Sequence, residues 1–150
     1  MKRILKNAFA VILIVSLVVS FTGCNIIDRF ILGNTVDKAG KWEDAIYRKD
    51  TELGEGSKTV TVEVRVEENS VNFILHTDCD MLGDALSEHG LVEGEMGVYG
   101  LYVKRINGIL ADYDVDGTYW GLYKNGEYSM TGVDTTPIAD GEHYELVCEG

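Results

Sequence analysis

Residues 59–67, TVTVEVRVE, alternate strictly between valine and polar or charged side chains. Successive side chains of a β-strand point to opposite faces, so all four valines of this segment share one face: Val60, Val62, Val64 and Val66. An apolar face opposite a polar one is typical of a half-buried strand. The turn ENS and a second apolar segment, VNFILHT at 71–77, follow directly. Residues 59–77 are therefore predicted to form a β-hairpin.

One short helix is predicted after this hairpin, within DCDMLGDALSEHGL at 78–91. Asp78 or Asp80 is expected to cap its first turn, and Gly90 to end it. The apolar residues between them share one helical face: Met81, Leu82, Ala85 and Leu86.

The remainder of the chain predicts strands joined by tight turns. The expected strands are GVYGLYVKRI, TYWGLYK, EYSM and HYELVC. Asn107-Gly108 and Asn125-Gly126 fit hairpin turns in which both residues take positive φ, and Asp140-Gly141 predicts a third turn. Residues 42–47 predict a short strand or arm, and residues 50–58 a loop. The order β-β-α-β-β-β-β predicts a small single α+β domain, with one short helix packed on a mostly antiparallel sheet.

The N-terminus has the layout of a secretory signal. Lys2, Arg3 and Lys6 precede an apolar segment at 7–21, which is followed by FTGC ending at Cys24. The segment resembles a bacterial lipoprotein signal, with Phe21 where leucine is usual. A transmembrane anchor is the alternative, but the apolar run is short of the roughly 20 residues that a spanning helix needs. We therefore expect a signal peptide at 1–23, lipidation of Cys24, a tether at 24–41 and a folded domain at 42–150 on the extracytoplasmic face of the membrane.

The chain is strongly acidic. Its net charge is −12, and removing the three positive charges of the signal leaves 10 Lys and Arg against 25 Asp and Glu, or −15. Such a chain repels nucleic-acid phosphates, which argues against nucleic-acid binding. Because no polybasic segment is present, the lipid is the expected link to the membrane. Cys79 and Cys148 could form a disulfide in an oxidising compartment or remain separate thiols, and the sequence leaves both open.

An acidic motif at Asp112, Asp114, Asp116 and Gly117 spells the opening of a calcium loop. An EF-hand loop also needs a bidentate glutamate at its twelfth position, and that position is Tyr123 here. We favour a solvated acidic turn, with the three aspartates as weak metal candidates. His76, His89 and His143 have no metal-ligand spacing, and no catalytic motif is recognisable, so a non-enzymatic role is predicted.

Aromatic residues are concentrated in the C-terminal third. Trp120 lies among tyrosines, and in a strand Tyr119, Gly121 and Tyr123 share one face while Trp120 and Leu122 share the other. Tyrosine and tryptophan supply large contact areas with polar tips, which suit ligand recognition. Cross-strand pairing that only stabilises the sheet is an equal alternative.

Residues 104–147 resemble the C-terminal β-domain of transcobalamin and gastric intrinsic factor, which also occurs in bacterial surface proteins and lipoproteins. The resemblance covers about 59–150 and rests on five short motifs: MLGDAL, Ile106-Asn107-Gly108, Tyr119-Trp120, Asn125-Gly126 and Asp140-Gly141. In the vertebrate proteins this domain covers one face of cobalamin, and a separate helical domain, which this chain lacks, holds the other. The resemblance implies a ligand site at Tyr119 and Trp120, with Asn107 and Gly108 shaping a neighbouring loop; Tyr123 joins it from the same strand.

Two hypotheses follow. The first is a lipid-anchored binding module for cobalamin, another corrinoid or another large planar or apolar molecule, working with a membrane transporter or a second surface protein. The second is a surface module that binds a protein or glycan without a cofactor. Calcium-dependent adhesion through Asp112, Asp114 and Asp116 is a weaker third.

Overall fold

A computed structural model describes residues 41–150. The predicted signal peptide, Cys24 and all but the last residue of the predicted tether lie outside these residues. Within 41–150, no helix has the length and apolar character needed to cross a membrane.

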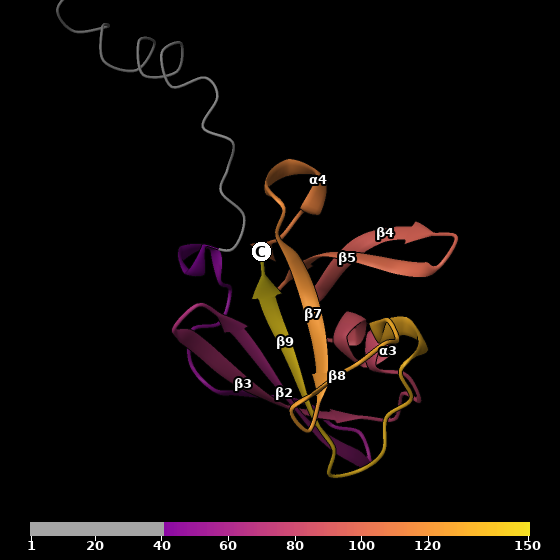
Figure 1. The fold of residues 1–150 in the computed structure, drawn as a ribbon. Coiled ribbons are helices and arrows are strands. Elements are labelled where there is room, and N and C mark those ends of the chain that lie inside the picture. The colour runs from indigo at the N-terminus through magenta and orange to yellow at the C-terminus, as the bar shows by residue number, and fades with distance from the viewer. Residues whose placement is uncertain (1–40) are drawn as a thin grey trace, which may run out of the picture. The chain divides into compact units, whose positions relative to one another are not determined.

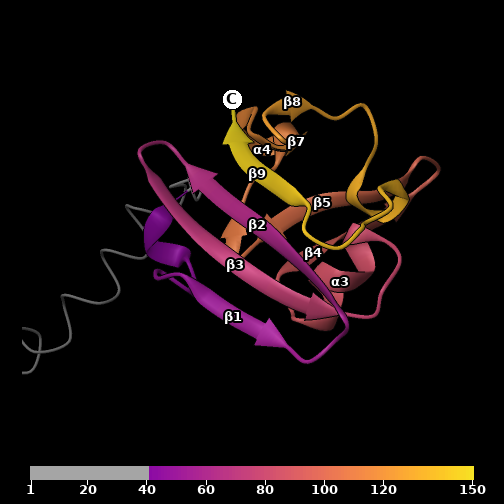
Figure 2. The same ribbon diagram turned by 90° about the horizontal axis from the view of Figure 1, so that it is seen from below.

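The largest element is a six-stranded sheet (Figures 1 and 2). Its strands lie in the order β1 (Thr51–Gly54), β3 (Asn69–Thr77), β2 (Lys58–Val66), β9 (His143–Glu149), β7 (Tyr119–Lys124) and β8 (Glu127–Tyr128). A second, three-stranded sheet contains β4 (Val92–Gly97), β5 (Gly100–Ile106) and β6 (Ile109–Leu110). Five of the seven strand pairings in the described chain are antiparallel, and β1–β3 and β2–β9 are parallel. The predicted, mostly antiparallel character is therefore confirmed.

Helical structure is scarce. The helix α3 (Leu82–Glu88) and the β4–β5 hairpin lie on one side of the large sheet (Figure 2). The other helical segments of the described chain are single turns: η1 (Trp42–Asp44), α4 (Tyr113–Asp116) and η2 (Val133–Thr135). The protein is consequently more sheet-rich than the α+β description expected from the sequence.

The core forms between the large sheet and α3. The β2–β3 hairpin is confirmed, and Val60, Val62 and Val64 are fully buried, as the alternation predicted. On α3 the predicted apolar face is also buried, through Leu82, Ala85 and Leu86. Gly90 follows the helix at a φ of 65°, in agreement with its expected role in ending the helix.

Both Asn-Gly turns are confirmed. Asn107 and Gly108 have φ values of 53° and 80°, and Asn125 and Gly126 have values of 53° and 81°. Two consecutive residues at positive φ match the twist of the flanking strands, as expected for two-residue hairpin turns.

Three strands were not predicted: β1, β4 and the two-residue β6. The polar segment expected to be a loop contains β1, which pairs in parallel with β3 and places Leu53 against the core. Residues before Gly97 form β4, whose side chains are nearly all exposed and whose pairing with β5 shifts at Glu93–Gly94. Neither β1 nor β4 has alternating apolar residues that would predict a strand. β1 depends on pairing with the distant strand β3, and β4 on pairing with β5 in an exposed hairpin.

Two further expectations concern the N-terminal arm and the start of α3, and only the second was wrong. Of the two alternatives for residues 42–47, the arm is observed and the strand is not: the segment begins with the single turn η1, in which the Asp44 and Ala45 N–H groups bond back to Lys41 and Trp42. Neither Asp78 nor Asp80 caps α3: its N-cap is Met81, which makes no side-chain cap bond.

Candidate functional site

An open edge of the large sheet positions the main candidate site. β7 pairs with β9 over its whole length, but β8 pairs only with Tyr123 and Lys124 at its far end. A cleft of about 320 Å³ lies beside the unpaired half of β7. Its walls come from β5, from β7 and from the segment after Tyr128, and the lining residues are Leu101, Tyr102, Val103, Tyr119, Trp120, Leu122, Tyr128, Ser129, Met130, Thr131, Gly132, Val133 and Leu146.

The inner part of the cleft is apolar. Leu122 and Leu146 are cross-strand partners, 5% and 1% exposed, and they belong to the core. Trp120 is half-buried, lies opposite Cys148 and packs against both core clusters. Its indole Nε1 is buried and has no hydrogen-bond partner in the described chain. This inner surface suits a flat apolar group.

The outer part of the cleft is exposed. Met130 is 92% exposed and Tyr128 54%. Large apolar side chains that line a concave surface yet remain in water are typical of a binding site rather than a core.

Hydrogen bonds fix the segment that forms the outer wall. The Asp134 carboxylate accepts from the Leu101 N–H at 3.1 Å and so joins η2 to β5. The Thr136 hydroxyl donates to the Gly132 carbonyl at 2.8 Å and lies 2.8 Å from the Thr131 hydroxyl. The two walls are therefore held in place without a ligand.

The opposite face of β7 carries a polar aromatic group. Tyr123 donates a hydrogen bond to the Glu149 carboxylate, which, together with partial burial, raises the pKa of Tyr123 to about 12. A hydrogen bond to the same carboxylate also raises the pKa of Tyr119. The predicted separation of faces is thus observed: Tyr119 and Tyr123 lie on the Glu149 side, and Trp120 and Leu122 on the core side. Glu149 had no signal in the sequence, because β9 brings it there from 26 residues beyond Tyr123.

Asn107 and Gly108 do not line the cleft. Asn107 is fully buried, and its side chain bonds the backbone of Tyr47 in both directions. Gly108 approaches the arm as well, since a Cβ at this position would lie 2.9 Å from the Ile46 side chain. The structure therefore separates these two residues from Tyr119, Trp120 and Tyr123, and gives Asn107 a structural contact.

The acidic motif forms the single turn α4. Asp112 caps this turn by accepting from the Asp114 N–H at 3.2 Å, and its other oxygen lies 3.0 Å from Lys104 Nζ. Asp116 accepts from the Thr118 N–H and hydroxyl. Among residues 41–150, no group of three or more His, Cys, Asp or Glu side chains is arranged to hold a metal ion. Asp112 and Asp116 are thus engaged in local turn contacts.

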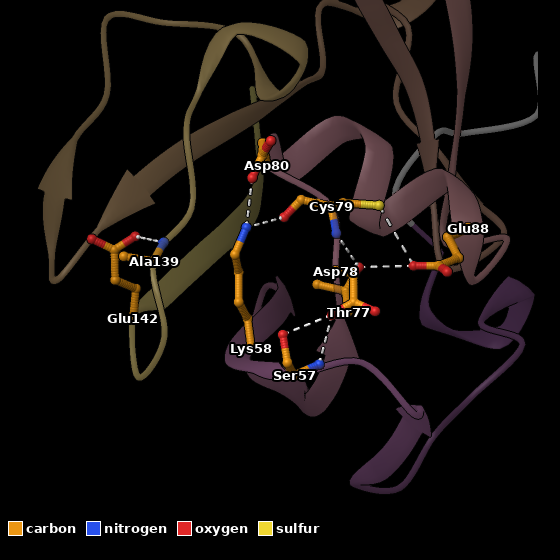
Figure 3. Close-up of polar contacts among 9 residues, drawn as sticks. All are labelled: Ser57, Lys58, Thr77, Asp78, Cys79, Asp80, Glu88, Ala139 and Glu142. Carbon is orange, nitrogen blue, oxygen red and sulfur yellow. Dashed lines mark hydrogen bonds and ion pairs between the residues drawn. The ribbon is translucent and has the colours of Figure 1, made fainter.

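Polar contacts also account for the aspartates before α3 (Figure 3). Asp78 accepts from the Ser57 N–H and hydroxyl, and Asp80 pairs with Lys58 at 2.7 Å. Cys79 lies between them, and its Sγ is 3.6 Å from a Glu88 oxygen that also accepts from Thr77. Both Cys79 and Cys148 are free thiols. Burial, followed by nearby carboxylates, raises the pKa of Cys148 to about 11.

Comparison with known proteins finds a matching family model and similar solved structures. Residues 80–144 match a family model described as a domain of unknown function, DUF4430. A crystal structure from Ruminococcus gnavus ATCC 29149, of a protein proposed to bind metal, is 35% identical, with a TM-score of 0.59. The alignment covers 62% of this chain and 97% of that protein. No curated protein matches.

A second solved structure is haptocorrin in complex with Cbi, at 23% identity and a TM-score of 0.47. The alignment covers 65% of this chain and 26% of haptocorrin. Because the chain is 35% identical to the Ruminococcus gnavus protein over 97% of that protein, it belongs to the same family as that protein.

Proposed function

We propose that this chain is a lipid-anchored extracytoplasmic protein that binds a small molecule in the cleft beside Trp120, without catalysing a reaction. The ligand we favour is cobalamin or another corrinoid, on the strength of the sequence resemblance. The observation that carries the proposal is the cleft itself, with Trp120 and Leu122 within it and Tyr128 and Met130 at its rim.

The chemistry of the lining supports binding over catalysis. The lining residues include no His, Cys, Asp, Glu, Lys or Arg. General acid–base and nucleophilic chemistry depend mostly on such groups. Apolar and aromatic surface with a few hydroxyls is instead the usual composition of a ligand pocket.

The size of the cleft limits how a corrinoid would bind. A volume of about 320 Å³ is at the small end of the range for drug-sized ligands, which is roughly 300–1,000 Å³. A corrin ring with its substituents exceeds this volume, so only one part of the ligand would enter beside Trp120. The rest would remain accessible, which suits a protein that passes its ligand to a transporter or a second surface protein.

Calorimetric titration of the full-length chain in detergent with cobalamin and cobinamide tests the proposal. The key variant is Met130→Glu, which places a charge at the cleft rim on a side chain that is 92% exposed and so leaves folding intact. The matched control is Met96→Glu, at a residue that is 76% exposed on the β4–β5 hairpin and outside the cleft. We expect saturable binding that Met130→Glu weakens about tenfold or more, equivalent to about 1.4 kcal/mol, while Met96→Glu leaves it unchanged. Absence of heat with both ligands, or equal loss in both variants, would contradict the proposal.

A second candidate is a protein-interaction module, and the β4–β5 hairpin favours it. Met96, Val98 and Tyr99 near its tip are 76%, 93% and 99% exposed. Exposed apolar side chains grouped in this way often mark a protein contact. A photo-crosslinking side chain at position 98, introduced in intact cells, should give one discrete adduct if this candidate is correct, and none if the hairpin has no partner.

A further inference from the structure

Four tyrosines from three elements meet on the face of the sheet opposite the core. Tyr119 and Tyr123 lie on β7, Tyr113 on α4 and Tyr128 on β8. The ring centroids of Tyr113 and Tyr119 are 6.5 Å apart, and those of Tyr123 and Tyr128 are 5.3 Å apart. Figure 1 places α4 above the start of β7, with the C-terminal end of β9 beside both. We call these four residues and Glu149 the tyrosine cluster.

Glu149 provides a negative charge within this cluster. Its carboxylate accepts a hydrogen bond from the Tyr123 hydroxyl, and its proximity to Tyr119 raises the pKa of that tyrosine as well. It lies over Gly121, where a Cβ would be 2.9 Å from its Oε2. The absence of a side chain at position 121 therefore makes room for the carboxylate between the two tyrosines of β7.

No cation of the described chain neutralises Glu149. None of the ion pairs within residues 41–150 includes it. Lys124 and Arg65 pair with other carboxylates near β9 rather than with Glu149. Lys124 pairs with Glu142 at 2.6 Å, and Arg65 pairs with Glu145. Glu149 is half-buried. Three rings of the cluster are exposed by 37%, 54% and 63%: Tyr119, Tyr128 and Tyr113.

This combination selects one class of ligand. The faces of aromatic rings attract cations. Proteins often bind quaternary ammonium ions with aromatic side chains, because the charge of such an ion is diffuse and its methyl groups pack against the rings. A metal ion needs several oxygen, nitrogen or sulfur ligands, and the described residues offer no such group here. We infer that the tyrosine cluster is a binding site for a trimethylammonium group, with Glu149 as its counter-charge.

The site is distinct from the cleft of the proposed function. Tyr119 and Tyr128 border both, but Tyr113, Tyr123 and Glu149 do not line the cleft, and Trp120 lies on the other face. Aromatic pairs that only stabilise the sheet are the structural alternative. That alternative predicts no response to quaternary ammonium ions.

The test is a titration of the full-length chain with tetramethylammonium and choline, followed by the NMR signals of the tyrosine rings. Ammonium chloride at equal concentration controls for charge and ionic strength. The variants are Tyr113→Ala and Glu149→Gln. The matched controls are Tyr99→Ala, which removes a ring that is 99% exposed on the hairpin, and Glu55→Gln, which neutralises an exposed carboxylate in the loop between β1 and β2. We expect saturable shifts in the millimolar range, weakened about fivefold or more by Tyr113→Ala and Glu149→Gln and by less than about twofold in the controls.

The outcomes separate the ligand sources and the two proposals. Competition of choline by phosphatidylcholine vesicles would identify a lipid headgroup as the source, and its absence would identify a free solute; both support the site. Shifts that stay linear to about 100 mM, or that ammonium ion reproduces, would overturn it. Met130→Glu removes none of the four rings and leaves Glu149 in place, so tetramethylammonium binding should persist even if corrinoid binding is lost.

Discussion

The side chain of Asn107 holds the backbone of Tyr47, 60 residues earlier in the chain, by two hydrogen bonds. Asn107 accepts from the Tyr47 N–H at 2.9 Å and donates to the Tyr47 carbonyl at 2.8 Å. The same residue occupies a hairpin turn at positive φ. One asparagine thus both forms a turn and attaches the N-terminal arm to the domain.

Replacing Asn107 should destabilise the protein more than replacing the equivalent residue of the other Asn-Gly turn. Asn107→Gly and Asn125→Gly both retain a residue that tolerates the φ of 53°, so they differ in the lost side-chain contacts. Losing the two bonds from a fully buried amide should cost about 1–3 kcal/mol. Urea unfolding of both variants measures the difference. Equal unfolding free energies would show that the bonds to Tyr47 contribute nothing.

Gly56→Ala should disturb the attachment of β1. A Cβ at position 56 would lie 2.1 Å from the backbone of Thr77 at the end of β3, and backbone atoms cannot move aside as a flexible side chain can. Overpacking of this kind costs about 1–3 kcal/mol. Gly97→Ala is the control, since its nearest contact is an ordinary 3.6 Å. Thermal unfolding should show a clear loss for Gly56→Ala only; a similar melting temperature for both variants would contradict the close packing.

Glu142 should contribute to stability against acid. Its burial opposes ionisation, but hydrogen bonds from Lys124, Tyr144 and the Ala139 N–H outweigh that effect and lower its pKa to about 2. A carboxyl group whose pKa falls on folding stabilises the protein above its unfolded pKa of about 4.5, and this stabilisation is lost as the pH falls from there to about 2. The melting temperature of Glu142→Gln should therefore be lower than that of the parent at pH 7, with the gap closing toward pH 2. A constant gap would refute this assignment.

Tyr123 should titrate abnormally because of Glu149. Its pKa is raised to about 12, so its stabilising contribution is complete below pH 10 and is lost as the pH rises toward 12. In Glu149→Gln the charged acceptor is absent, and the pKa of Tyr123 should move back toward 10. NMR titration with ring-labelled tyrosine follows the residue directly. A pKa of Tyr123 that is the same in both proteins would sink the assignment, and Glu55→Gln, in the loop between β1 and β2, serves as the control for a carboxylate outside the cluster.

The sequence was informative where a structure depends on neighbouring residues. The alternation at Val60 to Val66 predicts β2, and both Asn-Gly pairs form the expected turns, because each signal is local. β1 and β4 have no such local signal. β1 forms because it pairs with the distant strand β3, and β4 because it pairs with β5 in an exposed hairpin.

The candidate sites follow the same rule. The alternating faces of β7 predict which side Trp120 and Tyr119 occupy. The remaining parts of each site come from elsewhere: Leu101 and Val133 complete the cleft, and Glu149 completes the tyrosine cluster. The resemblance assigned Asn107 to a loop near the ligand. Its side chain instead binds Tyr47, which is 60 residues away in the sequence, so no local pattern indicates this contact.

The most direct test of the cleft is the response of the two tryptophan indole N–H signals in the NMR spectrum of the ¹⁵N-labelled full-length chain. Trp120 lines the cleft and its Nε1 has no hydrogen-bond partner among residues 41–150, whereas Trp42 does not line the cleft. On addition of diamagnetic cobinamide, the account predicts a saturable shift of the Trp120 signal while the Trp42 signal stays in place. Absence of any shift at Trp120 at saturating ligand, or equal shifts of both signals, would contradict a corrinoid site in this cleft.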